Sequence, residues 1–323
     1  MKAVVCTKYN SLKHLKILEV PKPFPKDDEV LIKVHATPVT TGDWRIQSLT
    51  IPLGFKFLIQ MIYGFSKPRS SILGTQLAGT IEATGENVKK FKIGDEVIAE
   101  SALGLGGHAE YKCMVETGSI ALKPKSLSFE EAAVLSFGGV TALDFLKYKT
   151  TLRPGERILV YGASGAVGIA AVQLAAYFGA KVTGVCSSPN FEFVKVYGAE
   201  NVIDYQTEDF TKNGEKYDVI LDAVGTLSMA NFKGSLTSHG RLLLVSPGLD
   251  EQLAAPFLNL LNSQKIVTGV ANASPQLMQE LCELVRAGKF KAVIDRQFAF
   301  EEIASAYEYV GQRHQKGNVV VKL

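Results

Sequence analysis

The sequence predicts an α/β fold with two parts, an antiparallel barrel-like unit first and a doubly wound parallel sheet after it. Short β-branched runs broken by Gly and Pro fill the first 120 residues. After Pro124, apolar runs alternate with helical segments at intervals of about thirty residues, as they do in βαβ units. A glycine-rich turn between the first such run and the first such helix completes the pattern.

The barrel-like part is predicted to consist of short strands whose residues alternate roughly between apolar and polar. These strands are expected at residues 2–7, 30–37, 80–84, 96–99 and 110–114. Their richness in β-branched side chains is typical of antiparallel strands. We expect no amphipathic helix longer than three turns in this part.

The second part is predicted to alternate strands with helices. Ser128 and Glu131 have the spacing of a helix capping box, so a helix is expected to begin there. Strands are expected at 157–161, 181–186, 202–203, 219–221, 241–245 and 266–270, with helices at 167–178 and 191–197 that end at Gly179 and Gly198. The last fifty residues are expected to hold two helices and a terminal strand, 319–323, which returns to complete the first part.

The composition is that of a globular protein. The chain has 323 residues, of which 46% are hydrophobic and 21% charged, and 35 Lys+Arg against 32 Asp+Glu give a formal charge of +3. This balance excludes a disordered chain. The basic residues are spread out, without the run typical of a nucleic-acid surface, so no nucleic-acid partner is expected.

The cysteines predict neither a disulfide framework nor a zinc site, because they lie far apart and no Cys/His pair has ligand spacing. They are Cys6, Cys113, Cys186 and Cys282. A reducing compartment is the simplest interpretation. The N-terminus lacks the apolar core of a signal peptide and the Arg/Ser-rich character of a transit peptide, so we expect a cytoplasmic location.

One apolar stretch, residues 49–65, is shorter than the ~20 residues that span a bilayer, and Pro52, Gly54 and Lys56 interrupt it. No transmembrane segment is therefore expected. Three interpretations are open: a packed loop and helix of the core, an apolar lid or wall over a greasy substrate site, or contact with a membrane surface.

The most informative segment is RILVYGASGAVGIAAVQL, residues 157–174, which places a glycine-rich turn between a strand and a helix. Gly165 would let the backbone approach a pyrophosphate, and Gly168 would let the helix pack closely on the strand. A dinucleotide site is predicted here, although Ala163 stands where the pattern G-x-G-x-x-G has its first glycine. The residues expected to hold the pyrophosphate are Ser164, Gly165, Ala166 and Val167.

The end of the second strand favours NADP(H) over NAD(H). An NAD-preferring site carries Asp or Glu there to hold the ribose 2′-OH, whereas this chain reads VCSSPN at 185–190. A carboxylate would repel a 2′-phosphate, but the hydroxyls of Ser187 and Ser188 would not. A simple turn would explain the serines at 187 and 188 equally well. No Arg that could bind the 2′-phosphate lies nearby in the sequence.

Three more residues follow predicted strands. Val224 and Gly225 come after the strand that ends near Asp222, and Ser246 comes after the next one. Open α/β sheets bind ligands at the carboxyl ends of their strands, so these residues are further candidates for contact with the cofactor.

Together these segments resemble the medium-chain dehydrogenase/reductase superfamily and, within it, the zinc-free quinone oxidoreductase (zeta-crystallin-like) branch. The segments that carry the resemblance are LGTQLAGTIEATG at 73–85, FKIGDEV at 91–97, GGHAEY at 106–111, the glycine-rich turn and GAENVIDY at 198–205. The resemblance covers almost the whole chain. It implies a GroES-like catalytic domain, 1–123 with 272–323, and a Rossmann domain, 124–271, with NADPH bound in the cleft. Homodimers are common in this branch, so a homodimer is implied.

The resemblance also assigns contacts with the cofactor. It implies that Thr141 contacts the nicotinamide end, although the start of an ordinary buried helix is an alternative. Tyr205 matches the tyrosine that packs near the adenosine 2′-phosphate, although a surface tyrosine at a strand end is an alternative. Asn190 stands where a similar type of relative has a lysine, so it is a weaker candidate for the same corner.

The departures from the zinc-using members imply that no metal is bound. Their ligand positions here read Thr40-Thr-Gly-Asp43, Gly74-Thr-Gln76 and approximately Phe137, and the four-cysteine structural lobe is missing. Arg45 stands where zinc alcohol dehydrogenases have a proton-relay histidine. The candidate donors near the acceptor are Thr40, Arg45 and Tyr63.

Without zinc, oxidation of an alcohol lacks an evident means of removing its proton. Reduction of a small hydrophobic quinone or α,β-unsaturated carbonyl by NADPH needs fewer catalytic groups than alcohol oxidation, because a few hydrogen-bond donors can hold and protonate the oxyanion. Such a reductase is the leading expectation. The alternatives are reduction of another acceptor, such as a 2-alkenal or an enoyl thioester, or a weakly catalytic protein that binds or senses NADPH or binds RNA.

Overall fold

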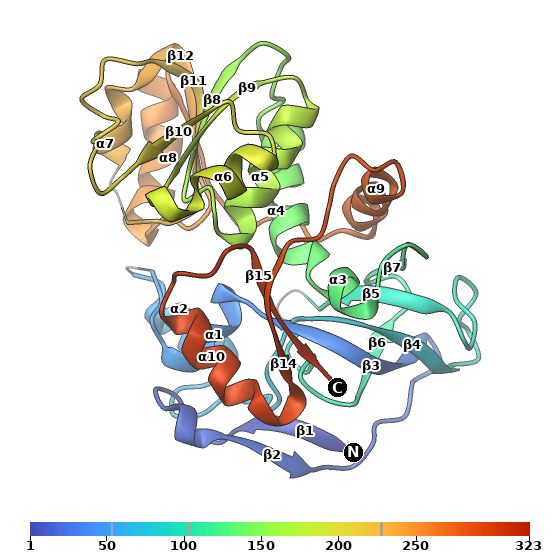
Figure 1. Ribbon diagram of the computed structural model, residues 1–323. Coiled ribbons are helices and arrows are strands. Elements are labelled where there is room, and N and C mark those ends of the chain that lie inside the picture. Colours follow the sequence, from blue (N-terminus) through green and yellow to red (C-terminus); the bar gives the residue numbers. More distant parts are fainter. Residues whose placement is uncertain (53, 102–103, 227–228) are drawn as a thin grey trace. The chain divides into compact units, whose positions relative to one another are not determined.

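The computed structural model describes residues 1–52, 54–101, 104–226 and 229–323 (Figure 1). These residues divide into two compact units. Unit 1 comprises Met1–Ile51, Lys56–Phe137 and Ala273–Leu323, and unit 2 comprises Pro52–Phe55 and Gly138–Asn272. The predicted domain limits, 1–123 with 272–323 and 124–271, stay a prediction.

In unit 2, the described residues form a six-stranded parallel sheet in the order β10-β9-β8-β11-β12-β13 (Figure 1). The strands are β8 (Arg157–Tyr161), β9 (Lys181–Cys186), β10 (Asn201–Asp204), β11 (Tyr217–Asp222), β12 (Leu236–Leu244) and β13 (Lys265–Val267). The order runs outward from β8 in both directions, which confirms the predicted doubly wound sheet. The last strand ends at Val267 instead of 270, because Gly269 takes a φ of 112°, outside the β region.

The helices of unit 2 are mostly short. They are α4 (Thr141–Leu143), α5 (Ala166–Tyr177), α6 (Phe191–Val196), α7 (Met229–Lys233) and α8 (Leu249–Leu261), with the 3₁₀ turn η4 (Ser188–Asn190) and the π-helical turn η3 (Asp144–Lys149). Nine of the twelve residues of α5 are buried, mostly Ala, Val and Gly. A helix that is apolar all round belongs inside a fold, and here it packs on β8 and β9.

In unit 1, the described residues form a seven-stranded sheet in the order β14-β15-β3-β4-β5-β7, with β6 paired to β3, and a two-stranded sheet of β1 and β2. The strands are β1 (Lys2–Cys6), β2 (Leu15–Glu19), β3 (Glu29–Val39), β4 (Gln76–Thr84), β5 (Glu96–Glu100), β6 (Tyr111–Val115), β7 (Ser119–Leu122), β14 (Ile294–Ala299) and β15 (Asn318–Lys322). β15 pairs antiparallel with β3, so the end of the chain returns to the first part as predicted.

The helices of unit 1 flank this sheet. They are α1 (Thr41–Ser48), α2 (Lys56–Tyr63), α3 (Phe129–Ala133), α9 (Pro275–Arg286) and α10 (Ile303–Gly311), with the 3₁₀ turns η1 (Leu12–His14) and η5 (Phe300–Glu302). The predicted capping box starts α3: Glu131 N–H donates to Ser128 Oγ at 3.1 Å, and Ser128 N–H donates to Glu131 Oε2 at 2.9 Å. In the described ranges, no helix is both long and apolar enough to cross a membrane.

A buried chain of hydrogen bonds links the strands of unit 1 to α10. Tyr307 OH lies 3.1 Å from His108 Nε2, His108 Nδ1 lies 3.0 Å from Thr37 Oγ1, and that hydroxyl donates to the Gln76 carbonyl at 2.7 Å. Because Thr37 gives its proton to the carbonyl, it accepts from His108, which in turn accepts from Tyr307. Burial lowers the pKa of His108 to about 3, so its ring stays neutral and structural.

Candidate functional site

A glycine-rich turn joins β8 to α5. Gly162 leaves the strand with a φ of 81°, and its N–H and that of Ala163 both lie 3.0 Å from the Val185 carbonyl. A β-carbon on Gly168 would lie 2.0 Å from the Gly162 carbonyl oxygen, so only glycine allows this approach of helix and turn. Ala163 occupies the position of the first glycine in the G-x-G-x-x-G pattern. Gly162, the residue before it, makes the tight turn in its place.

The start of α5 carries no side-chain cap from the described residues. Gly165 is the N-cap residue, with an extended backbone of φ −78° and ψ 174°. The nearest atom to a β-carbon built there would be 3.6 Å away, so space is open beside it. Free N–H groups at the positive end of a twelve-residue helix suit a phosphate. Ser164, Ala166 and Val167 flank this N-cap, and their contact with a pyrophosphate stays a prediction.

Two neighbouring strands end beside the turn. A β-carbon on Gly162 would lie 2.5 Å from Val224 Cγ2, and one on Gly225 would lie 2.6 Å from the Ser246 carbonyl oxygen. Asp222 Oδ1 holds this corner by accepting the N–H groups of Val224 at 2.8 Å and Gly225 at 3.0 Å. The structure thus brings the three predicted strand-end residues to the edge where β8, β11 and β12 stop.

The predicted 2′-phosphate corner lies at the ends of β9 and β10. These strands pair in parallel with Asp204 opposite Cys186, so Ser187 and Ser188 after β9 are near Tyr205 after β10. Tyr205 is half-exposed, and Ser188 is exposed. The structure therefore brings these three candidates to one corner.

Sequence reasoning missed Asp204 in this corner. Its carboxylate accepts the N–H groups of Ser188 at 3.3 Å and Gln206 at 2.9 Å, and it is buried. An NAD-binding site is expected to carry its acid at the end of the second strand of the sheet, here β9. Asp204 instead ends the third strand, β10, so a search at the usual spacing does not find it. Asn190 is also buried: its Nδ2 donates to Ser187 Oγ at 3.2 Å, and its Oδ1 has no partner among the described residues.

Thr141 follows a π-helical turn, η2 (Ser136–Val140), and begins α4. Within that turn, a β-carbon on Gly138 would lie 2.3 Å from the Ala166 carbonyl oxygen, so the turn packs directly on the start of α5. π-helical turns of this kind are frequent at functional sites. Thr141 is therefore one turn of helix from the glycine-rich turn.

The candidate donor Thr40 caps α1 together with Asp43. Thr40 Oγ1 donates to Asp43 Oδ2 at 2.7 Å and accepts Asp43 N–H at 3.1 Å, and both residues are buried. Burial raises the pKa of Asp43 to about 6, while its hydrogen bonds with Thr40 and Thr75 act in the opposite direction. The single hydroxyl proton of Thr40 is thus already engaged.

A second buried carboxyl, Glu100, lies at the end of β5, directly opposite Gln76 on β4. Burial raises the pKa of Glu100 to about 7, the nearby polar side chains of Gln76 and Ser136 lower it, and the negative charge of Asp43 raises it. Glu100 Oε2, Asp43 Oδ1 and both amide atoms of Gln76 are buried without a hydrogen-bond partner among the described residues. Unit 1 therefore contains a polar cluster that titrates near neutral pH, and sequence patterns gave no signal for Glu100.

The other two candidate donors lie on the helices of unit 1. Arg45 is partly buried on α1. Tyr63 ends α2 and is buried, and its carbonyl accepts the Tyr9 hydroxyl at 3.2 Å. Burial, and then the charge of Asp43, raise the pKa of the Tyr63 hydroxyl. Catalytic roles for Thr40, Arg45 and Tyr63 stay predictions.

The residues at the zinc-ligand positions do not fit a zinc ion. Thr40 is hydrogen-bonded to Asp43, and the Phe137 ring lies 3.6 Å from a β-carbon built on Gly42, against the first turn of α1. These side chains offer no thiolate or imidazole, the ligands that zinc prefers. Across 1–52, 54–101, 104–226 and 229–323, no three His, Cys, Asp or Glu residues lie close enough to share a metal ion.

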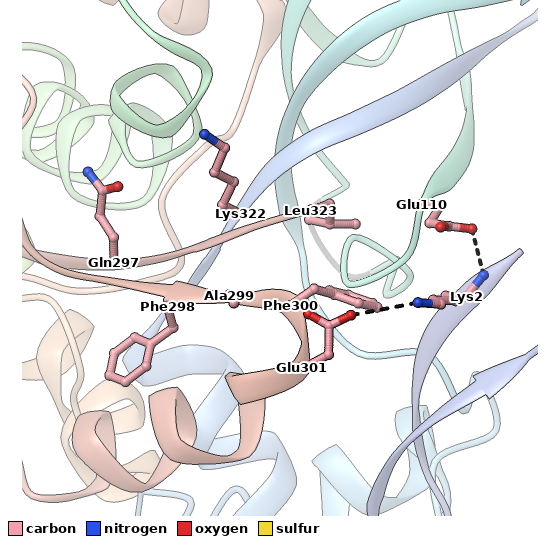
Figure 2. Close-up of a pocket in the computed structure, with 9 residues that line it drawn as sticks. All are labelled: Lys2, Glu110, Gln297, Phe298, Ala299, Phe300, Glu301, Lys322 and Leu323. Carbon is pink, nitrogen blue, oxygen red and sulfur yellow. Dashed lines mark hydrogen bonds and ion pairs between the residues drawn. The ribbon is translucent and has the colours of Figure 1, made fainter.

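A pocket of about 530 Å³ lies in unit 1, and none of the predicted site residues lines it. It is lined by Lys2, Glu110, Gln297, Phe298, Ala299, Phe300, Glu301, Lys322 and Leu323 (Figure 2). Its charged side chains already have partners: Lys2 Nζ lies 3.7 Å from Glu301, Lys322 Nζ lies 3.3 Å from Glu130, and Glu110 accepts the backbone N–H of Lys2 at 2.7 Å. We assign no role to this pocket.

Two family models match the chain: the alcohol dehydrogenase GroES-like domain at residues 26–129 and the zinc-binding dehydrogenase at 197–321. A quinone oxidoreductase, QR1, of Triphysaria versicolor is 34% identical over 95% of this chain and 94% of its own. An NADPH-dependent alkenal/one oxidoreductase of Arabidopsis thaliana is 31% identical over 99% of this chain and 79% of its own. The solved quinone oxidoreductase of Coxiella burnetii superposes with a TM-score of 0.88 at 27% identity, covering 100% and 99% of the two chains.

A GroES-like domain combined with a doubly wound sheet and its glycine-rich turn defines a dehydrogenase or reductase that uses a nicotinamide cofactor. The chain belongs to the medium-chain dehydrogenase/reductase superfamily, in its quinone oxidoreductase branch. The predicted family, α/β fold class and oxidoreductase class are confirmed.

Substitution of two glycines in the turn tests folding and cofactor binding separately. We expect Gly168→Ala to cost about 1–3 kcal/mol of unfolding free energy, because its β-carbon would meet backbone that cannot move aside. Gly165→Ala has open space and is expected to fold normally but to bind the dinucleotide at least tenfold more weakly. Denaturant unfolding and fluorescence titration with NADPH measure the two effects. Unchanged affinity in Gly165→Ala would place the phosphates elsewhere.

Glu100→Gln tests the buried cluster. Folding raises the pKa of Glu100 from 4.5 to about 7, so the folded state holds more protons in that window and stability falls as pH rises through it. The variant is therefore expected to exceed the wild type in unfolding free energy by about 1–3 kcal/mol near pH 8, with the difference vanishing toward about pH 4. Exposed Glu86→Gln is the matched control. A difference that does not change with pH would contradict the assignment.

Proposed function

We propose that this chain is a zinc-independent, NADPH-dependent reductase of small hydrophobic quinones or α,β-unsaturated carbonyls. The observation that carries the proposal is the pairing of two features in one chain. The phosphate-type turn of β8 and α5 is retained, while Thr40 and Phe137 replace zinc ligands. Relatives named for quinone and alkenal/one reduction support the choice of acceptor.

The residues that would hold NADPH come from unit 2. The turn from Ser164 to Val167 would bind the pyrophosphate, and Val224, Gly225 and Ser246 would line the strand ends. Ser187, Ser188, Asn190 and Tyr205 would receive the 2′-phosphate, and Thr141 would contact the nicotinamide end. The Asp204 carboxylate in that corner is engaged by backbone N–H groups, which supports tolerance of a phosphate.

When bound, NADPH supplies a hydride to the activated carbon of the acceptor. The protein must then hold the developing oxyanion, exclude water and provide a proton. The Arg45 guanidinium would stabilise negative charge on the acceptor oxygen. Thr40 and Tyr63 are the candidate hydroxyl donors, although Thr40 would first have to release its hydrogen bond to Asp43. Burial raises the pKa values of Asp43 and Glu100 toward neutrality, so these carboxyls would hold protons for the reaction.

We also propose a homodimer and a cytoplasmic location. The homodimer is supported by α8, whose Phe257, Leu260 and Leu261 are strongly exposed beside β13, the last strand of its sheet. Exposed apolar patches next to an unpaired sheet edge favour association.

Cofactor preference tests the 2′-phosphate corner. The wild type is expected to bind NADPH more tightly than NADH, and Tyr205→Ala should bring the two affinities closer. Ser187→Asp places a carboxylate beside the phosphate, so NADPH affinity should fall at least tenfold while NADH affinity changes little. Ser238→Asp, exposed on β12, adds the same charge as a control. Equal affinities in the wild type would refute the preference.

Turnover tests the reaction. Chelator-treated protein is expected to oxidise NADPH with quinones and conjugated enones at the rate of untreated protein, because the described residues include no set suited to zinc. The assay follows the absorbance of NADPH across quinones, 2-alkenals, an enoyl thioester and a simple ketone. Loss of activity on chelation, restored by zinc, would overturn the metal-free proposal. Tight NADPH binding without turnover on any acceptor would favour a sensing role.

A further inference from the structure

One side of α2 and the residue just beyond it form an exposed apolar patch on unit 1. The α2 patch consists of Phe57 (65% exposed), Leu58 (45%), Met61 (46%), Ile62 (40%) and Phe65 (55%). The opposite side of the helix is anchored, because Tyr63 is buried in the core of unit 1 and its carbonyl accepts the Tyr9 hydroxyl. The helix is therefore apolar on both sides: Ile59 and Tyr63 pack in the core of unit 1, and the α2 patch faces solvent.

The α2 patch is continuous beyond the end of the helix. Gly64 turns the chain with a φ of 111°, and a β-carbon there would lie 2.3 Å from the Lys67 carbonyl oxygen. Gln60 Nε2 donates to the Phe65 carbonyl at 3.1 Å, and the rings of Phe57 and Phe65 meet edge to face at 6.1 Å. These contacts hold both aromatic rings in one surface.

The charged residues in the segment that carries the α2 patch are all positive. Lys56 precedes it and Lys67 and Arg69 follow it, and residues 49–71 contain no Asp or Glu. All three basic side chains are exposed, and none forms an ion pair within the described part of the chain. We call these three residues the basic rim.

The exposed face of α8 differs in charge. Its first turn carries Asp250 and Glu251, which precede Phe257 and Leu260. It also lies beside the edge strand β13, which suits a second copy of the chain. Residues 49–71 contain no acid and, where the structure describes them, no strand, so the α2 patch suits a partner of different chemistry.

We propose that the α2 patch docks on an anionic lipid surface, with its apolar side chains at the boundary of headgroups and acyl chains and the basic rim against lipid phosphates. Short helices with one apolar face and basic flanks lie in the plane of a membrane interface in this way. Long basic side chains reach back to the headgroups. Docking would give the chain access to hydrophobic molecules dissolved in the bilayer. The proposal does not rest on the proposed function, because binding is measured without turnover.

Vesicle flotation of the full chain tests the docking, with phosphatidylcholine vesicles prepared with and without phosphatidylserine. The wild type is expected to float with the anionic vesicles, and less so at high salt, because salt screens the basic rim. The double variant Phe57→Ser/Phe65→Ser should lose binding about tenfold or more. Lys67→Ala and Arg69→Ala should each lose about fivefold on anionic vesicles only.

Phe24→Ser is the matched control, because Phe24 is an 87%-exposed aromatic of the same unit that lies outside the α2 patch. It is expected to bind vesicles like the wild type. Thermal unfolding of every variant checks that the fold is retained. The proposal is overturned if the wild type does not float with anionic vesicles, or if Phe24→Ser loses as much binding as the double variant. It is also overturned if the double variant binds vesicles normally but has a raised KM for a small water-soluble quinone, which would make the patch part of the acceptor site.

Discussion

The contact between the backbone of α5 and the turn that precedes it is the constraint on which unit 2 depends. Gly168 lies against the Gly162 carbonyl, and Gly138 lies against the Ala166 carbonyl, both at distances that no β-carbon would permit. These approaches bring the uncapped helix start to the edge where three strands end. Small residues along α5 let it pack deep in the unit, and the same lack of side chains leaves the N–H groups at its start open to a phosphate, as proposed above.

The stability and protonation state of unit 1 depend on how the hydrogen bonds of its buried polar groups are satisfied. The chain from Tyr307 through His108 and Thr37 to the Gln76 carbonyl is complete, so burial costs it little. The side chains of Gln76 and Glu100, a short distance away, are incompletely paired, and burial moves the pKa of Glu100 toward neutrality. Unit 1 thus combines a neutral structural network with a neighbouring site that can bind and release protons.

Local signals made unit 2 largely predictable. β8 and β11 contain short uninterrupted apolar runs, and Gly179 and Gly198 follow the ends of α5 and α6 as predicted. Unit 1 was less predictable because β2 and β14 are half-exposed and lack clear alternation, and β14 forms only by pairing with β15. Asp204 and Glu100 were missed for the same reason: each acquires its role from a neighbour on another strand, which spacing along the chain does not reveal.

The retained Asp43 and the lost zinc ligands are consistent with each other. As a capping residue, Asp43 satisfies the first turn of α1 through Thr40, a role that stabilises a helix by about 1 kcal/mol and needs no metal. Its second oxygen, without a described partner, lies in the environment that raises its pKa to about 6. A cation there would favour the ionised carboxylate, whereas burial favours the protonated form. This region of unit 1 therefore has two carboxyl groups whose pKa values are raised toward neutrality, as expected of a group that supplies a proton after hydride transfer in the function proposed above.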